Sequence, residues 1–431
     1  MSANISWHKL SRDAMSVPFE RGYRAAVSVT RTVEFFLLVF VASVPFESAW
    51  QAGTAEVPLF SISRITGLAL LLACLLRPRP CLLPLPRPVL YYLAYLWVTL
   101  VALVLNGGER AAEALQTDFM LLQMLVLLWI VYSLCTNRAV FNRVIMVLEL
   151  SISVLAVSQI FNITSVKYDG LVPRTSVFSE DPNTVGAVLA IGFLANVWSL
   201  TRAHARWRKA ISGLSLPLIG VALAQTGSRS AVVALAAGLC AVIIMRRHGL
   251  RSIPAYAKLA AVAAVLIIAI ISTPTMIDRL QASIQNAELA ERQQIWSSAV
   301  DITIERPLLG WGTFHNFDVL GQRTGYGFVD THNLFLLILT QVGLIGAIPY
   351  LLGLAGSIRG AWIARRDAIY GIALPLLTVV LLVNCGITWH NRKLHWLILA
   401  LALAAANGLR ERRQVVLVGH EKAPRWHLES A

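Results

Sequence analysis

The chain has 431 residues, of which 57% are hydrophobic and only 14% are charged. Because a soluble domain carries roughly 25% charged residues, this composition excludes an ordinary soluble protein and indicates an integral membrane protein. The net charge of +14 is better explained by orientation in the membrane than by nucleic acid, and we expect no nucleic-acid partner. The five cysteines have neither CxxC spacing nor histidine partners, so the sequence supports neither a disulfide framework nor a zinc site.

Apolar runs long enough to cross a bilayer recur about twelve times, since one span needs about 20 residues. The resulting fold class is all-α and polytopic, with a cytoplasmic N-terminal segment (1–32), a transmembrane domain (33–409) and a cytoplasmic tail (410–431). Residues 1–32 are basic and precede any apolar core, so we expect no cleavable signal peptide. The predicted spans are 33–50, 58–76, 88–105, 117–135, 144–163, 183–201, 210–226, 230–246, 255–273, 333–353, 369–387 and 394–409.

Charged residues set the predicted orientation. With the N-terminus inside, most of the 37 Lys and Arg fall on cytoplasmic connections, whereas most of the 23 Asp and Glu fall on the opposite side. This distribution follows the positive-inside rule, so both termini are predicted to be cytoplasmic.

One connection on the outer side, 274–332, is much longer than the others. Within it, 278–300 has apolar residues at near-helical spacing and predicts one amphipathic helix. The segment Pro307–Gly312, with the sequence PLLGWG, predicts a turn after that helix.

Four polar residues of the outer face are candidate functional groups. Arg174 precedes the predicted helix entry Asp181-Pro182-Asn183, Arg229 lies in a hairpin too short to leave the membrane surface, and His332 follows Asp330 at the start of a span. Each also has an ordinary interpretation: a headgroup anchor or ion pair for the arginines, a satisfied boundary histidine for His332, and a helix cap for Asp330.

Taken together, these groups suit a substrate with a diphosphate head and a lipid tail. A guanidinium can donate two hydrogen bonds to two oxygens of one phosphate, and it stays charged in a site from which water is partly excluded. An imidazole can accept a proton from a hydroxyl nucleophile. The outer face carries no DxD motif or comparable carboxylate cluster. The sequence therefore predicts a metal-independent transfer with no cofactor.

The strongest pattern is His332-Asn333, followed after nine residues by Gly343-x-x-Gly346. It resembles the signature of the O-antigen ligase family, enzymes that join O-antigen polysaccharide to lipid A–core. Supporting matches are Arg174 to Asn183, Gly227 to Ser230, Arg292 to Trp296, and Arg306 to Gly312. The first four spans and the tail carry no such motif.

The resemblance implies an all-helical glycosyltransferase of the GT-C type in the bacterial inner membrane, with a periplasmic active site and with the long connection 274–332 as a helical periplasmic lid. The donor would be an undecaprenyl-diphosphate-linked O-antigen, and the acceptor would be a sugar hydroxyl of lipid A–core. Membrane lipids would surround the protein. Arg174 and Arg229 would bind the diphosphate. His332 would be the base, or a positioner, in an inverting transfer, with Arg292, Asn333 and Asp330 as supporting residues.

Three alternatives remain open. An O-antigen polymerase uses the same donor but usually has two sizeable periplasmic loops, whereas only one is predicted here. A protein O-oligosaccharyltransferase tends to add a C-terminal periplasmic domain. A flippase for the lipid-linked sugar would favour charges buried at mid-membrane, and Glu149 is the main candidate of that kind.

Overall fold

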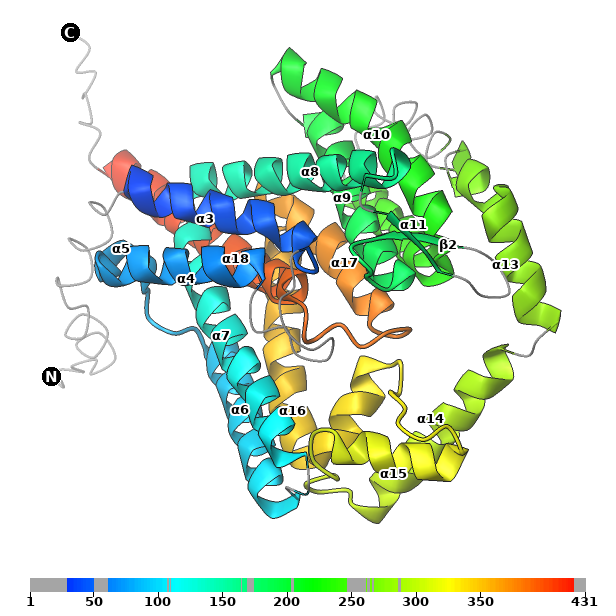
Figure 1. Cartoon of the computed structure of the whole chain (residues 1–431). Coiled ribbons are helices and arrows are strands. Elements are labelled where there is room, and N and C mark those ends of the chain that lie inside the picture. The colour runs from blue at the N-terminus through cyan, green and yellow to red at the C-terminus, as the bar shows by residue number, and fades with distance from the viewer. Residues whose placement is uncertain are drawn as a thin grey trace, which may run out of the picture.

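The computed structural model describes residues 29–49, 61–106, 108, 110–163, 165–168, 174–202, 205–245, 261, 264–265, 267–285 and 288–421. Within these ranges the protein is almost entirely helical (Figure 1). The predicted span 255–273 and the segments 1–32 and 410–431 lie largely or partly outside the described residues.

Six described helices are long and apolar enough to cross a membrane. They coincide with the third to seventh and the tenth predicted spans, and the multi-pass character of the chain is confirmed. The six are α6 (Arg87–Asn106), α7 (Ala111–Cys135), α8 (Arg138–Ile160), α9 (Pro182–Arg202), α10 (Arg206–Thr226) and α16 (Leu334–Ala364).

Shorter apolar helices occupy several of the remaining predicted spans. They are α4 (Ile62–Leu75), α11 (Arg229–Ile244) and the pair η3 (Tyr370–Ile372) and α17 (Ala373–Val383). The first and last predicted spans fall on α3 (Arg31–Ser43), which η1 (Val44–Phe46) extends, and on α18 (Lys393–Glu421); α5 (Pro78–Cys81) is a single turn. The count of twelve spans and the GT-C architecture stay predictions.

The helix bundle has two ends, which differ in the residues that meet there. At one end Arg138 pairs with Asp367 at 2.8 Å, and Arg143 pairs with Glu34. At the other end the connection between α17 and α18, residues 384–392, lies near the start of α16; we call this the His332 end. Each pair joins residues predicted to share one side of the membrane.

The long connection contains three helices: α13 (Pro274–Gln285), α14 (Glu288–Glu305) and α15 (His315–Thr324). The prediction of one helix over 278–300 is therefore wrong. The physical reason is packing, because α13 contacts α10 whereas α14 contacts α15 and α16. One straight helix could not follow both surfaces.

A two-stranded hairpin is a further departure from the all-helical expectation. Strand β1 (Ser165–Tyr168) pairs antiparallel with β2 (Arg174–Val177), with Tyr168 opposite Arg174. Valine, threonine and tyrosine supply the side chains that favour extended backbone. After β2, the predicted helix entry is confirmed: Asp181 Oδ1 accepts from the Asn183 and Thr184 amides at 2.8 and 3.2 Å, and α9 begins at Pro182.

The helix α16 is broken at Gly343, where φ is 57° and ψ is −159°. The predicted span 333–353 therefore falls on a helix that is bent at Gly343 and not straight. In a straight helix Leu334 and Tyr350 would be about 24 Å apart along the axis. Here the Leu334 amide donates to the Asn384 carbonyl at 2.9 Å, and Tyr350 reaches the Asn384 amide group through the two ring nitrogens of His395. The segments 334–342 and 344–364 therefore form a bent pair.

Backbone contacts explain the glycine at the break. The Leu344 amide donates to the Pro307 carbonyl at 2.8 Å and the Ile345 amide to the Leu308 carbonyl at 3.1 Å. A Cβ added at Gly343 would lie 2.4 Å from the Leu308 carbonyl carbon, and one at Gly310 would lie 2.5 Å from the Gln341 carbonyl carbon. The predicted turn at 307–312 is confirmed, and it docks directly on the break. We call this contact the glycine junction.

Candidate active site at the His332 end

His332 lies in a short segment of unusual backbone just before α16. Its φ is +49°, a region that histidine and asparagine adopt more readily than most residues. Asn333 caps the helix, because its Oδ1 accepts from the Phe335 and Leu336 amides at 3.0 and 3.2 Å. The cap is therefore Asn333 rather than Asp330.

The His332 ring is open to solvent on one side and faces a carboxylate on the other. Its side chain is 47% exposed, and Nδ1 lies 4.0 Å from Asp330 Oδ2. Asp330 Oδ2 also accepts from the Thr388 hydroxyl. The Asp330 carboxylate therefore faces Nδ1 of the ring.

The connection 384–392 supports the whole segment. Asn333 Nδ2 donates to the Cys385 carbonyl at 3.4 Å, and the Leu334 amide bonds the Asn384 carbonyl. From the lid, the Trp296 indole donates to the Thr331 carbonyl at 3.0 Å. The position of His332 is therefore fixed by α16, by this connection and by α14 together.

Arg292 and the turn of Arg229 meet the same connection at Gly386. A Cβ added to Gly386 would lie 3.8 Å from Arg292 Nη1 and 3.5 Å from Ser230 Cβ. Ser230 follows Arg229, the first residue of α11, and Gly227 ends α10 with φ of +61°. The predicted tight hairpin is confirmed, and the structure brings it close to Arg292.

Arg174 lies further away, on β2, which contacts α8, α9 and α10. The segment after β2 reaches the connection 384–392 through Glu180, whose two oxygens accept from Arg392 at 2.9 and 2.5 Å. The structure thus brings five predicted site residues, or residues next to them, close to the connection 384–392. They are Arg229, Arg292, Asp330, His332 and Asn333. The structure joins Arg174 to that connection through β2 and Glu180.

His332 lies two residues before Leu334, the first residue of α16. The segment of α16 after the break, 344–364, is about 30 Å long, the thickness of a hydrocarbon core. The position of His332 at the start of this helix agrees with the prediction, and the side of the membrane that it faces stays a prediction.

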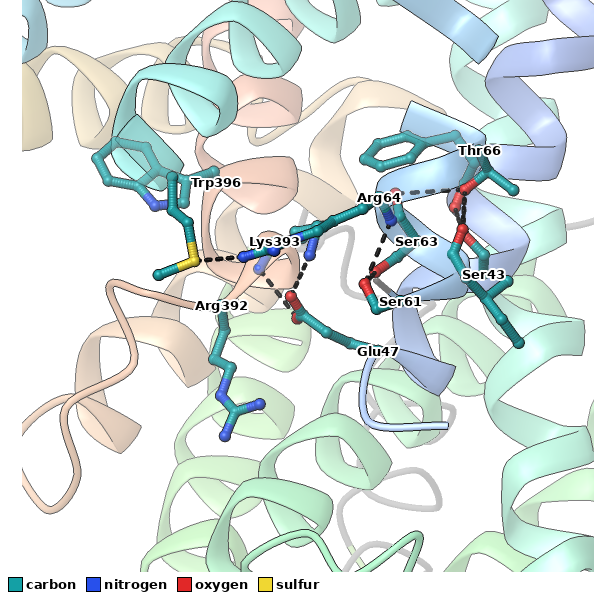
Figure 2. A network of polar contacts seen from close by, with 12 residues as sticks. Ser43, Glu47, Ser61, Ser63, Arg64, Thr66, Arg392, Lys393 and Trp396 are labelled. Atoms are coloured by element: carbon teal, nitrogen blue, oxygen red, sulfur yellow. Dashed lines mark hydrogen bonds and ion pairs between the residues drawn. The ribbon is translucent and has the colours of Figure 1, made fainter. Parts of the chain in front are cut away.

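Two ion pairs near the start of α18 join it to the segment after β2 and to the end of η1. Lys393 Nζ bonds Glu47, which follows η1, as Figure 2 shows. Burial opposes the charge on Arg392, but the carboxylates of Glu180 and Glu47 outweigh it and raise the pKa of Arg392. A cavity of about 30 Å³ borders Glu47, Glu180 and Arg392. It holds water-sized molecules and not a sugar.

His390 is the one histidine of the connection 384–392. Burial lowers the pKa of His390 to about 4, against the attraction of the Asp330 carboxylate. Its backbone carbonyl accepts from the Trp396 indole. The two histidines thus differ in environment, since His332 is half-exposed and His390 is held neutral in a drier place.

Sequence patterns did not single out four polar residues at positions 384–393 that support this end of the bundle. These are Asn384, Thr388, Arg392 and Lys393, with Glu47 and Glu180 as partners. A signal was present, because the basic pair Arg392-Lys393 and the two acids were all predicted to face the outer side. Pairing opposite charges across predicted connections would have found them.

Known proteins support the resemblance drawn from the motifs. Residues 211–351 match the family model described as O-antigen ligase. This range holds α10, α11, the lid and the His332 segment, but not Arg174. An O-antigen ligase of Pseudomonas aeruginosa is 30% identical over 196 residues, which are 44% of this chain and 45% of that protein.

The chain spans about half the length of that curated relative. The two matches nevertheless agree with each other and with the pattern of His332, Asn333, Gly343 and Gly346. The resemblance to the O-antigen ligase family is confirmed.

Proposed function

We propose that this protein is a glycosyltransferase that moves O-antigen polysaccharide from undecaprenyl diphosphate to a sugar hydroxyl of lipid A–core. The reaction takes place at the periplasmic face of the bacterial inner membrane, with both termini cytoplasmic. The observation that carries the proposal is the convergence of His332, Arg292 and the turn of Arg229, all within the region that matches the O-antigen ligase family, on the connection 384–392.

In the proposed reaction, the acceptor hydroxyl gives its proton to His332 Nε2 as its oxygen attacks the anomeric carbon of the donor sugar. The bond from that carbon to the diphosphate oxygen breaks, and its electron pair leaves with undecaprenyl diphosphate. Attack from the face opposite the leaving group inverts the configuration. Asp330 stabilises the resulting imidazolium through Nδ1, at the distance of 4.0 Å seen here.

The leaving diphosphate needs cations, and the guanidinium groups supply them. Arg174 and Arg229 are assigned to the diphosphate, and Arg292 carries a third cation from the lid. Asn333 fixes the segment by capping α16. A fixed set of arginines can stabilise developing phosphate charge without a divalent metal, so we propose a metal-independent transfer.

Expression in a host that lacks its own ligase tests the proposal. The chain should restore a ladder of long lipopolysaccharide bands on gels, while Arg229→Ala and Arg174→Ala should reduce it. Arg323→Ala is the matched control, because Arg323 pairs with Glu305 on the exposed surface of the lid. Absence of the ladder from a well-expressed chain would contradict ligation.

Two further measurements separate the alternatives. A chain that restores polymer length in a polymerase-null host, and no ladder in the ligase-null host, would be a polymerase. Transfer by the purified protein should persist in EDTA. A strict Mg²⁺ requirement would contradict the metal-independent mechanism.

A further inference from the structure

The helix α14 of the lid has three distinct faces. Its buried face packs on α15 and the first half of α16, through residues Ile295, Ala299 and Ile302. At about 100° per residue, two other sectors point away from that contact. One is exposed and, in the C-terminal half of α14, apolar, with Val300 and with Ile304 at 70% exposure, while Gln293 and Ser297 occupy it nearer the start of the helix; the other carries the exposed charges Asp301 and Glu305.

The exposed apolar face continues through Leu308, which is 59% exposed. Leu308 bonds the backbone of Ile345 at the glycine junction, where α16 enters its full-length span. The neighbouring side chains Leu344 and Ile345 are themselves about half exposed and belong to the lipid-facing side of that span. The apolar stripe of α14 is therefore continuous with a transmembrane surface.

A second transmembrane helix meets the same stripe. Arg306 Nη1 donates to Asn106 Oδ1 at 2.7 Å, at the end of α6. Just before that end, Val104 is 84% exposed and Leu105 is 62% exposed. Two spanning helices therefore present apolar surface at the level where Leu308 and the end of α14 lie.

An aromatic and a basic group lie at the C-terminal end of α14, where the tryptophan also packs against the buried face. The Arg306 guanidinium lies 4.0 Å from the centre of the Trp311 ring, and the Trp311 indole donates to the Ile302 carbonyl at 2.7 Å. Tryptophan and arginine are typical of the headgroup level of a bilayer. A helix with one face on protein, one apolar face and one charged face fits the boundary between lipid and water.

We propose that α14 lies in the plane of the membrane, with Val300, Ile304 and Leu308 in the edge of the bilayer hydrocarbon. Asp301 and Glu305 then face the aqueous headgroup side. The lid is held by lipid as well as by the glycine junction. This placement does not depend on the reaction that the protein catalyses.

Spin-label accessibility in lipid nanodiscs tests the placement. Ile304→Cys and Asp301→Cys are each labelled in a background that carries Cys240→Ser and Cys385→Ser, because those two native thiols are exposed. The label at 304 should collide with oxygen several-fold more than with a water-soluble nickel chelate, relative to the label at 301. Val300→Cys, on the same face as Ile304, should repeat the result.

An equal collision ratio at 301 and 304 would place α14 in water and overturn the proposal. Low collision with both reagents at 304 would mean that protein covers the stripe, and this too would overturn it. Melting temperatures of the unlabelled variants check that the fold is kept. Because the readout is lipid contact, its failure is distinguishable from a failure of the proposed transfer reaction.

Discussion

Two contacts next to the His332 segment differ in how far they use side chains. The glycine junction joins backbone to backbone, with four amide–carbonyl bonds of 2.8 to 3.1 Å between residues 307–312 and 340–345. The connection 384–392 makes one backbone bond, from the Leu334 amide to the Asn384 carbonyl, and adds side-chain contacts in which Thr388 donates to Asp330 and Arg392 pairs with Glu180. The first contact has no room for a side chain, whereas the second depends on charge and therefore responds to pH and to pairwise substitution.

The largest expected effect is at the glycine junction. Gly343→Ala forces a Cβ against the Leu308 backbone and into a φ,ψ combination that is essentially restricted to glycine. We expect a loss of at least about 3 kcal/mol in the free energy of unfolding, seen as a lower melting temperature and yield.

The matched control is Gly213→Ala in α10, where a Cβ meets only Leu200 at 3.9 Å. It should be neutral or slightly stabilising, because alanine favours helix over glycine. Equal melting temperatures for the two variants would show that the junction does not need glycine.

The next effect is at the ion pair of the connection. Arg392→Ala leaves Glu180 partly buried without its cation and should cost about 1–3 kcal/mol of unfolding free energy. The exposed pair of Arg323 and Glu305 is the control, and Arg323→Ala should cost less than about 1 kcal/mol.

A double variant sharpens this test. Glu180→Gln combined with Arg392→Gln removes both charges and should recover much of the loss seen in Arg392→Ala. If the double variant is no more stable than the single one, the pair acts through packing and not through charge.

The side-chain contact should also show a pH dependence. The pKa of His390 is about 4 in the fold, below the value of about 6.5 expected when unfolded. The unfolded state therefore takes up the proton first, so the free energy of unfolding falls as pH drops from 6.5 to 4, by up to about 3 kcal/mol.

The measurement is the melting temperature at pH 7.5 and 4.5. The wild-type protein should lose more than His390→Gln, which has no proton to take up there. His315→Gln in α15 is the control and should follow the wild-type curve. A curve for His390→Gln that coincides with the wild type would contradict this assignment.

The smallest effect is expected at Asp330. Asp330→Asn keeps the shape but removes the charge that faces His332 Nδ1, and should cost about 1 kcal/mol of transition-state stabilisation, roughly fivefold in kcat. The KM for the acceptor should stay near the wild-type value. An unchanged kcat would show that Asp330 acts only through Thr388.

Much of the architecture followed from local patterns. Apolar runs located the spans, the Asp181 cap and Pro182 fixed the start of α9, and Gly227-Ser228 fixed the turn before Arg229. These features depend on neighbours in the sequence. The confirmed family resemblance rests in the same way on fixed spacing after His332.

The bend of α16 could not be predicted in this way. Glycine at 343 permits the break, but the contact with the turn at 307–312 that accompanies this conformation lies far from it in the sequence. Likewise, α13 and α14 are separate because they pack on different helices. The ion pairs of the connection join Glu47 and Glu180 to residues far along the chain, and single-sequence patterns carry no such distance.

The most direct test of the account replaces His332 by asparagine in a purified transfer assay. Asparagine also tolerates a φ of +49°, so His332→Asn should keep the wild-type melting temperature and remove only the base. We predict a fall in kcat of about 10²–10⁴-fold, with polysaccharide transfer to lipid A–core as the readout. Wild-type kcat in a folded His332→Asn protein would contradict the claim that His332 is the catalytic base.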